Sequence, residues 1–368
     1  MSKSIPPISY LSPAAEADNN ENIDIFDRAK SYGVEEFHLK HDAATGLKAV
    51  VAIHGPHRGP ALGGTRCLTY PTVDHALYDA ARLARAMSFK SAFAGLHYSG
   101  GKGVLIRPAQ IQNADAYFES YGAFIDSLGG RFITAVDVGT SVDDMNIIAR
   151  RTKHVLSTSV SHGDPSLFTA RGLVRGILAA VKNRLNRDDI EGLHIGVQGV
   201  GKVGFHLVYL LHQQGAKITI SEKNDEVARQ CIDNFGATRV GINKIYGIDC
   251  DVLSPCALGG VINDATVHQI KARVICGAAN NQLTSDRHGD ILHKKKIFYV
   301  PDYVVNAGGL IHVALGETKQ SQAAITGIYN AVTDIYQRSD STQEPSHRAA
   351  NRIAEQIISE SKPRSVFV

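Results

Sequence analysis

A short stretch in the middle of the chain constrains its fold more than any other. The apolar segment Leu193–Val197 leads into Gly199-Val-Gly-Lys-Val-Gly204, a G-x-G-x-x-G motif. The pattern then predicts a helix through Gln213 and a second strand, Lys217–Ser221, which ends at Glu222. The glycines let the backbone close on a pyrophosphate at the helix N-terminus, and the acid accepts hydrogen bonds from ribose hydroxyls. The motif alone would fit an ordinary strand-to-helix turn, but with both strands, the helix and the acid it predicts a dinucleotide-binding fold.

The chain around this stretch extends the pattern into a mostly parallel sheet. An apolar-periodic helix is expected at Ser166–Leu185, before the first strand. Strands that alternate with helices are typical of α/β domains with a parallel sheet. The further strands are expected at Asp251–Leu253, Arg273–Cys276 and Ile297–Val300, and the last helices at Gln320–Gln337 and Ser346–Ser359.

The N-terminal half has a different order of elements, which indicates a second α/β domain. Since the chain has 368 residues and one core usually spans no more than roughly 250–300, two domains are expected. Residues 1–22 are polar and are expected to be irregular. The elements expected next are strands at Glu35–Lys40 and Lys48–His54, a glycine-rich corner at Gly59–Arg66, a helix from the N-cap Thr72 to Met87, a helix at Gln110–Leu128, a strand at Phe132–Ala135 and a capping box at Ser141–Asp144.

Two lysines and an aspartate in this half are placed as functional groups would be. Lys90 and Lys102 flank a stretch in which Lys102 follows Gly100-Gly101, read here as a turn, and leads into an apolar run. Two ammonium groups that share a cleft lower each other's pKa, and a partly desolvated one can act as a base near neutral pH. Two solvated surface lysines are an equally good interpretation. Asp137 follows a short strand, where it is either a functional acid or a turn residue that bonds its own backbone.

Composition argues against several classes of partner. Lys and Arg total 39 against 36 Asp and Glu, and no basic block dominates a segment, so neither nucleic acid nor an anionic membrane is expected as a partner. The five cysteines form no C-x-x-C pair and indicate reduced thiols of a cytoplasmic protein. No charged leader and no run of about 18 apolar residues occurs, so neither export nor a membrane span is expected. Despite 16 histidines there is no H-E-x-x-H motif, and no metal is expected.

Several separated motifs are specific when they are taken together. They are Gly59-Pro-Ala-Leu-Gly-Gly-Thr-Arg66, Lys90 with Gly100-Gly-Lys102, Ala135-Val-Asp-Val-Gly-Thr140, Gly163-Asp-Pro-Ser166, Gln198-Gly-Val-Gly-Lys-Val-Gly204, Ser254-Pro-Cys-Ala-Leu258, Gly277-Ala-Ala-Asn-Asn-Gln-Leu283 and Pro301-Asp-Tyr-Val-Val-Asn-Ala-Gly-Gly309. With them the chain resembles the amino-acid dehydrogenase superfamily, the glutamate/leucine/phenylalanine/valine dehydrogenases, and most of all the leucine dehydrogenases. The resemblance extends from about Glu35 to Arg352.

This resemblance implies an architecture. The fold class is α/β with two domains, an N-terminal α/β substrate-binding and oligomerisation domain and a Rossmann-type NAD-binding domain, separated by a cleft. We expect the first domain over residues 1–165 and the second over residues 166–337. A C-terminal helix over residues 338–368 is expected to pack back on the first domain. The protein is expected to be a cytoplasmic homo-oligomer that uses NAD.

The resemblance also implies a reaction and assigns residues to it. Oxidative deamination moves a hydride from Cα to the nicotinamide and then adds water to the resulting iminium. Lys90 would bind the substrate carboxylate, helped by Asn306 and by backbone N–H groups at Gly63 and Gly64. Lys102 would activate the attacking water, and Asp137 would exchange protons with the amino group. The implied cofactor contacts are Thr169 at the nicotinamide carboxamide together with Gly199, Val200, Gly201, Val203, Gly204, Glu222, Lys223, Ala257, Ala279 and Asn280.

Two positions imply the kind of substrate. Leu62 stands where glutamate-specific relatives have a lysine, and Ala135 stands where leucine-type relatives have alanine and phenylalanine-type relatives have glycine. Leu62 disfavours glutamate, and Ala135 favours a branched-chain aliphatic L-amino acid over phenylalanine. An aromatic amino-acid dehydrogenase is one alternative, and a catalytically silent NAD-binding regulator is another. Glu222 favours NAD over NADP, although the neighbouring Lys223 could soften that preference.

Overall fold

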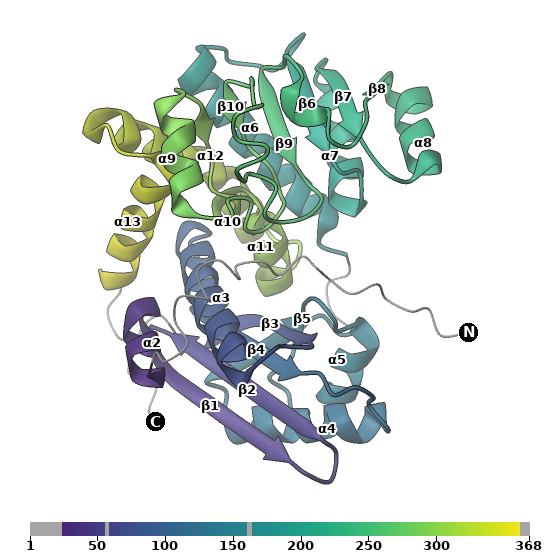
Figure 1. The fold of residues 1–368 in the computed structure, drawn as a ribbon, viewed down its shortest axis with the longest axis vertical. Coiled ribbons are helices and arrows are strands. Elements are labelled where there is room, and N and C mark those ends of the chain that lie inside the picture. The colour runs from purple at the N-terminus through teal and green to yellow at the C-terminus, as the bar shows by residue number, and fades with distance from the viewer. Residues whose placement is uncertain (1–23, 56–58, 160–163, 361–368) are drawn as a thin grey trace. The chain divides into compact units, whose positions relative to one another are not determined.

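The structure is a computed structural model that describes residues 24–55, 59–159 and 164–360. The irregular start expected for residues 1–22 lies outside the described residues. Contacts divide the described chain into two compact units (Figure 1). One holds residues within 24–172, 307–331 and 350–360, and the other holds residues 173–306 and 332–349. Contact units and folding domains are different divisions, so the domain bounds expected at 165 and 337 stay a prediction.

The first unit contains a five-stranded mixed sheet. Its order is β1-β2-β4-β3-β5, with β1 at Val34–Asp42, β2 at Leu47–His54, β3 at Ala61–Leu68, β4 at Ser99–Ile106 and β5 at Phe132–Val136. Strand β2 runs antiparallel to β1 and β4, as the expected hairpin requires, whereas β3 runs parallel to β4 and β5. The sheet therefore presents parallel strand ends at β3, β4 and β5, where functional groups commonly gather.

Helices cover both faces of this sheet. Val50, Ala52 and Val104 pack with α3 (Val73–Phe93), while the alternate positions Val51, Ile53 and Leu105 pack with α4 (Ala114–Ser127). Since successive side chains of a strand point to opposite faces, α3 and α4 lie on opposite sides of the sheet (Figure 1). The expected N-cap is confirmed, because the Thr72 side chain accepts from the His75 N–H.

Two glycine pairs contradict the expectation of a corner and a turn. Gly63-Gly64 lies inside β3 and Gly100-Gly101 inside β4. A Cβ on Gly63 would lie 1.7 Å from the Gly101 carbonyl oxygen, and one on Gly100 would lie 2.0 Å from the Ala84 carbonyl oxygen of α3. The glycines are therefore needed for close approach of neighbouring backbones, which is their usual meaning inside a strand.

The second unit contains a six-stranded parallel sheet. Its order is β11-β10-β9-β6-β7-β8, with β6 at His194–Gln198, β7 at Lys217–Ser221, β8 at Thr238–Arg239, β9 at Val252–Pro255, β10 at Val274–Ile275 and β11 at Phe298–Tyr299. Helix α7 (Lys202–Gln213) contacts β6 and β7, and α9 (Asp286–Lys294) contacts β11. The chain order reverses at β6, between β7 and β9. Ligands bind at such switch points in open α/β sheets, so the expected parallel sheet is confirmed and places the glycine motif there.

The remaining helices complete the two units. They are α2 (Ile25–Tyr32), α5 (Val142–Ala149), α6 (Ser166–Leu185), α8 (Asp225–Phe235), the 3-10 helix η2 (Ile245–Gly247), α10 (Asp302–Val305), α11 (Ala307–Leu315), α12 (Lys319–Thr342) and α13 (Ser346–Ser359). The expected bounds of α6 and α13 are confirmed, and so is the capping box of α5. Helix α4 begins later than expected because Asn113 caps it.

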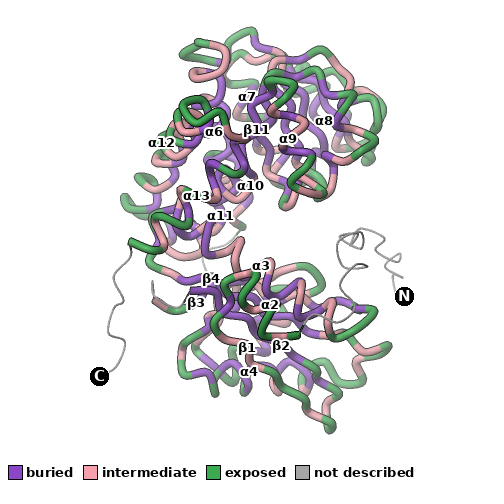
Figure 2. Tube along the Cα trace, turned by 60° about the vertical axis from the view of Figure 1, so that its left-hand side comes forward, coloured by how far each residue is buried: buried purple, intermediate pink, exposed green. Residues whose placement is uncertain are grey.

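Burial follows the strands and the inner faces of the helices (Figure 2). Strand β4 is buried from Ser99 to Leu105, although it carries a lysine. Within the described ranges, no helix is long and apolar enough to cross a membrane.

Candidate active site

The predicted catalytic residues lie on the α3 face of the five-stranded sheet. Gly100 faces α3, as its close approach to the Ala84 carbonyl shows, and Lys102 two residues further along β4 faces the same side. On β3 the alternation places Leu62, Gly64 and Arg66 on this face as well. Asp137 follows the end of β5 and reaches both Lys102 and Arg66.

A buried ion pair joins the two predicted catalytic groups. The Lys102 ammonium contacts Asp137 Oδ2, and the same oxygen accepts from Arg66 Nε at 3.2 Å. The Lys102 side chain is 6% exposed and that of Asp137 is 22% exposed. The turn after β5 fixes the backbone at Asp137, because the Asp137 N–H donates to Thr140 Oγ1 at 3.0 Å. The structure thus brings Lys102 and Asp137 together, as their predicted roles need.

Burial and neighbouring charges set the proton affinities of this pair. Burial lowers the pKa of Lys102, while the charge of Asp137 opposes that effect and the charge of Arg66 reinforces it. Burial alone would raise the pKa of Asp137, but the nearby Lys102 and Arg66 hold that pKa below its usual range. From the sequence, Lys90 is the cation expected to lower the pKa of Lys102, whereas the cation that lowers it in the structure is Arg66.

A second buried carboxylate holds Arg66 from the helix side. Asp79 of α3 accepts from Arg66 Nη1 at 2.9 Å and from the Tyr70 hydroxyl at 2.8 Å, both at Oδ2. Its other oxygen accepts from Arg82 Nη2 at 3.0 Å. These donors offset the cost of burial and keep the pKa of Asp79 below its ordinary value.

Of the predicted substrate contacts, Lys90 lies on α3, Leu62, Gly63 and Gly64 lie on β3, and Ala135 lies on β5. Lys90 is half-buried in the last turn of α3. Leu62 is buried, and its register neighbours are Gly100 of β4 and Ile133 of β5. Gly64 pairs with Ala135, and a Cβ on Gly64 would lie 2.7 Å from the Cβ of Asp137. The close approach of these backbones explains why β3 carries glycine there.

The glycine motif forms a tight turn that is open on its outer side. Gly199 has φ +88, and a Cβ there would lie 2.4 Å from the Ala257 Cβ. A Cβ on Gly204 would lie 2.2 Å from the Gly199 carbonyl oxygen. Gly201, which caps α7, has open space at its Cβ position, and Val203 follows in the first turn. This combination fits a pyrophosphate at a helix N-terminus.

The predicted ribose acid lies beside this turn. The Val200 N–H donates to Glu222 Oε2 at 2.6 Å, and the Asn224 N–H donates to Oε1 at 2.9 Å. Arg239 of β8 donates to the Glu222 carbonyl oxygen at 2.7 Å and pairs with Asp225 at 2.8 Å. Glu222 therefore sits at the end of β7 with its carboxylate directed to the glycine turn, and Lys223 is exposed next to it.

The other predicted cofactor and substrate residues are placed as follows. Asn306 Nδ2 donates to Asn280 Oδ1 at 2.8 Å, so the structure brings these two predicted residues together. Asn306 Oδ1 is buried and accepts no hydrogen bond from the described residues, which suits an atom that binds a ligand. Ala257 is exposed and Ala279 is buried. In the other unit, Thr169 Oγ1 donates to the Pro165 carbonyl at 3.1 Å in the first turn of α6.

Arg66 and Asp79, which contact the Asp137 carboxylate directly or through one another, are not among the predicted site residues. The sequence carries a signal for both. Arg66 closes the glycine-rich motif and shares the alternation of Leu62 and Gly64. Asp79 stands among apolar residues that fall at helical spacing, where an acid needs a partner.

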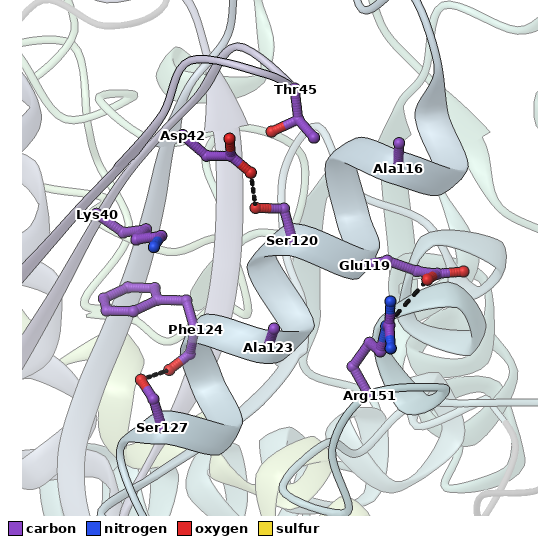
Figure 3. A pocket seen from close by; sticks show the side chains of 10 residues that line it. All are labelled: Lys40, Asp42, Thr45, Ala116, Glu119, Ser120, Ala123, Phe124, Ser127 and Arg151. Carbon is purple, nitrogen blue, oxygen red and sulfur yellow. Dashed lines mark hydrogen bonds and ion pairs between the residues drawn. The ribbon is translucent and has the colours of Figure 1, made fainter.

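A separate pocket of about 530 Å³ lies between β1 and α4 (Figure 3). Two of its lining carboxylates, those of Asp42 and Glu119, accept hydrogen bonds from neighbouring side chains. Ser120 donates to Asp42 at 2.6 Å, and Arg151 donates to Glu119 at 3.0 Å. None of the predicted site residues lines it. Among the residues that the structure describes, no group of three or more His, Cys, Asp or Glu side chains could hold a metal.

Comparison with known proteins places the chain in a family. The model described as Glu/Leu/Phe/Val dehydrogenase, dimerisation domain, matches residues 33–154, and the Glutamate/Leucine/Phenylalanine/Valine dehydrogenase model matches residues 220–361. The leucine dehydrogenase of Geobacillus stearothermophilus is 44% identical over 354 residues, which cover 94% of this chain and 96% of that protein. The chain belongs to the Glu/Leu/Phe/Val dehydrogenase family.

Other members of the family are similar in sequence and structure. The solved L-tryptophan dehydrogenase of Nostoc punctiforme superposes with a TM-score of 0.83 at 37% identity, covering 91% of this chain and 99% of that one. The phenylalanine dehydrogenase of Bacillus thermotolerans is 36% identical over 94% of each chain. The predicted family and the predicted two-part α/β fold class are therefore confirmed, and the protein is an amino-acid dehydrogenase.

Proposed function

We propose that this dehydrogenase catalyses the reversible NAD-dependent oxidative deamination of a branched-chain aliphatic L-amino acid to the 2-oxo acid and ammonia. The observation that carries the proposal is the buried pair of Lys102 and Asp137 on the sheet face. A lysine base and an acid in contact are what deamination requires, since one activates water and the other exchanges protons with the amine. A silent regulator would have no need to keep this pair buried at the cost of desolvating two charges.

The residues around the pair support a division of roles. Lys102 takes the proton of the attacking water, and Asp137 holds the proton that passes to and from the substrate amine. Lys90 binds the substrate carboxylate, with the backbone of Gly63 and Gly64. Asn306, with its buried and unpartnered Oδ1, completes the substrate contacts. These assignments follow from the chemistry of each group.

The glycine turn fits the dinucleotide. When bound there, NAD supplies the hydride acceptor. Gly199 and Gly204 let the turn close, while the open side of Gly201 leaves room for the pyrophosphate. Glu222 accepts hydrogen bonds from the ribose, for which it would exchange its present bond to the Val200 N–H. Thr169, Ala257, Ala279 and Asn280 complete the proposed cofactor contacts.

The side chains near the pair support an aliphatic substrate. Leu62 is apolar and buried, so a second carboxylate placed against it would be a desolvated charge without a partner, at a cost of several kcal/mol. Ala135 narrows the space next to Asp137 by one methyl compared with glycine. A difference of that size is worth only ~1–3 kcal/mol, so discrimination against aromatic rings should be incomplete. The tryptophan and phenylalanine dehydrogenases among the relatives make an aromatic substrate the second candidate.

We further propose a cytoplasmic homo-oligomer with the domain bounds given by the sequence, residues 1–165 and 166–337, and a C-terminal segment, residues 338–368, that packs on the first domain. Within that segment the expected single helix is wrong, because α12 ends at Thr342 and α13 begins at Ser346. Residues 33–154 match a model described as a dimerisation domain, which supports self-association. Size-exclusion chromatography with light scattering tests this part of the proposal, and a monomer at micromolar concentration would contradict it.

An NADH-production assay over the common L-amino acids tests the function. We expect leucine, isoleucine and valine to give the highest kcat/KM, phenylalanine and tryptophan to be weaker, and glutamate to be near background. The Ala135→Gly variant should gain activity with phenylalanine relative to leucine by about 10-fold or less, since only one methyl is removed. An aromatic amino acid or glutamate as the best substrate of the wild type would overturn the proposal.

A further inference from the structure

Arg66 occupies a position that no role assigned so far explains. Its guanidinium lies between the buried Asp79 carboxylate and the partly buried Asp137 carboxylate, with Nε 3.2 Å from Asp137 Oδ2 and Nη1 2.9 Å from Asp79 Oδ2. The Arg66 side chain is 11% exposed, and that of Asp79 is 7% exposed. A buried arginine that spans two acids is oriented by both, because its donors form a rigid fork. Arg66 therefore links a carboxylate of helix α3 to the predicted catalytic acid.

The link fixes the geometry of Asp137. A carboxylate held by a single flexible lysine can rotate about its χ angles, whereas Asp137 Oδ2 accepts from Lys102 and Arg66 at once. Arg66 in turn cannot follow a moving Asp137, since Asp79 is itself held by Tyr70 and Arg82. A group that transfers protons must be held close to its productive position, and a 1 Å misplacement can cost about 100-fold in rate.

The link also balances the charges of the pair. With Asp137 as its only charged neighbour, Lys102 would be stabilised as the ammonium, which cannot act as a base. Arg66 donates to the same Asp137 oxygen as Lys102, and its positive charge repels the Lys102 ammonium. The charge of Arg66 therefore lowers the pKa of Lys102. The charged and titratable groups that face Arg66 are Lys102 of β4, Asp137 after β5, Asp79 and Arg82 of α3, and Tyr70 after β3.

We propose that Arg66, seated by Asp79, is a positioning residue that holds the Asp137 carboxylate and lets Lys102 give up its proton during turnover. The inference rests on the proposed deamination. Arg66 contacts Asp137 directly and is linked to Lys102 through the shared Asp137 oxygen. It acts by orienting the Asp137 carboxylate and by its own charge. Its effect should therefore be visible in the pH dependence of the reaction and not only in its rate.

The test compares the pH profiles of variants with the wild type. For leucine and NAD, kcat/KM of the wild type is expected to rise from pH 7 towards pH 10 as the base loses its proton. In Arg66→Gln the rising limb should move to higher pH, and kcat near neutral pH should fall by about 10–100-fold. NADH binding, measured by calorimetry, should be unchanged. Arg66→Lys keeps the charge and should restore the position of the limb while leaving kcat reduced, because one ammonium cannot bridge both acids.

Arg82→Gln is the matched control. It removes one arginine that donates to the Asp79 carboxylate and leaves the contacts of Asp137 in place. The rising limb of the kcat/KM profile should therefore keep its wild-type position. Asp79→Asn leaves Arg66 without its charged anchor and should lower kcat. It also removes a negative charge that raises the pKa of Lys102, so the rising limb should move to lower pH, opposite to its movement in Arg66→Gln. If Arg66→Gln does not fold, Arg66→Lys and Asp79→Asn carry the test. A rising limb that stays in place in Arg66→Gln or Asp79→Asn, or an equal displacement in Arg82→Gln, would overturn the inference.

A second measurement keeps this inference separate from the proposed function. The reaction of Lys102 with acetic anhydride as a function of pH, followed by mass spectrometry, reports its deprotonation without turnover. A wild type that oxidises no L-amino acid would refute the proposed function, whereas the labelling midpoint of Lys102 would still be expected to move to higher pH in Arg66→Gln. An active wild type with an unmoved midpoint in Arg66→Gln would refute the inference alone.

Discussion

At the scale of single residues, the site depends on how Lys102 is neutralised inside the protein. Its side chain is almost completely buried, and a buried ammonium without a partner would cost several kcal/mol. In the resting protein, the ion pair with Asp137 offsets that free-energy cost. During the reaction the lysine must release a proton, and burial favours the neutral amine. The same burial therefore disfavours the ammonium and favours the base.

Replacing this lysine should separate binding from chemistry. We expect Lys102→Met to lower kcat by ~10²–10⁴-fold, because a general base is lost. NAD binding should persist, since the glycine turn and Glu222 lie on other elements. Calorimetry with NAD and the NADH assay measure the two effects. Lys48→Met, at an exposed position of β2, is the control and should keep wild-type kcat. Near-native turnover of Lys102→Met would show that another group is the base.

Single residues also show where sequence reasoning stops. Lys102 and Asp137 stand out in the sequence because each follows a local signal, a glycine pair in one case and a strand end in the other, and the family resemblance gives each a role. Arg66 and Asp79 depend on contacts between β3 and α3, and the identity of each becomes informative only when the other is beside it. Their charges look like ordinary surface charges in the sequence, yet both side chains are buried.

At the scale of elements, β4 and α3 are packed as closely as two backbones allow. Gly100 permits this close packing, although its sequence context predicts a turn. Glycine has two common uses, unusual backbone angles and close approach, and the sequence alone does not separate them. Helix α11 was missed for a related reason. Its Gly308-Gly309 pair is typical of a turn, but a Cβ on Gly308 would lie 2.1 Å from the Phe168 carbonyl oxygen, so packing decides the helix.

A methyl group at this contact should be costly. In Gly100→Ala the new Cβ would lie 2.0 Å from Ala84 O and 2.3 Å from Ser88 N, both of them backbone atoms. We expect the free energy of unfolding to fall by about 1–3 kcal/mol or more. Thermal unfolding measures the change. Gly327→Ala in α12, where nothing lies within 4 Å, is the control and should be neutral or slightly stabilising. Equal melting temperatures for the two variants would contradict the packing argument.

The end of β7 should determine the choice of cofactor. Glu222 would meet the 2′-phosphate of NADP as like charge against like charge, at a cost of several kcal/mol. We therefore expect kcat/KM to favour NAD by about 100-fold or more. Glu222→Ser should lower the ratio of kcat/KM with NAD to kcat/KM with NADP, because Lys223 and Arg239 then remain as nearby cations. Glu226→Ser, at an exposed acid of α8, should leave it unchanged. Equal kcat/KM for NAD and NADP in the wild type would refute the role given to Glu222.

At the scale of the whole molecule, fold class was the most predictable property. The second sheet repeats strand and helix with short connections, so β7 and α6 are found at their bounds from periodicity alone. The first sheet mixes antiparallel and parallel neighbours, and its order of β1-β2-β4-β3-β5 depends on pairings far apart in the sequence. Hydrophobic patterns reveal which segments are strands, but they do not reveal which strands are neighbours.

The stability of the whole molecule should depend on pH through a histidine that the proposed reaction does not use. His54, at the end of β2, is 8% exposed, and its Nδ1 lies 2.9 Å from Ser88 Oγ of α3. Burial, with the charge of Arg85, lowers the pKa of His54 from 6.5 to about 4. Burial also lowers the pKa of His347. The folded protein therefore keeps these side chains neutral at pH values where an unfolded chain would protonate them.

The sign of the effect follows from that difference. Above pH 6.5 neither state binds the proton at His54, so the folded state loses nothing. Between pH 6.5 and about 4 the unfolded chain gains the proton and the folded state does not, which destabilises the fold as the pH falls. The full shift corresponds to about 3 kcal/mol. The lowered pKa values of Asp79 and Asp137 act in the same direction only below the pKa of an unfolded aspartate, so the window above pH 4 belongs to the histidines.

Replacing His54 should remove its share of this acid sensitivity. Asparagine can place an amide nitrogen near the position of Nδ1 and does not titrate. Between pH 7.5 and pH 5, the free energy of unfolding of the wild type should fall by about 2 kcal/mol more than that of His54→Asn. Urea titrations at the two pH values measure the difference, with His268→Asn at an exposed position as the control. The variant starts from a lower stability at pH 7.5 because it packs less well, so the decisive quantity is the change with pH. If His54→Asn lost as much stability as the wild type between the two pH values, His54 would have to bind its proton in the folded state, and the burial argument would fail.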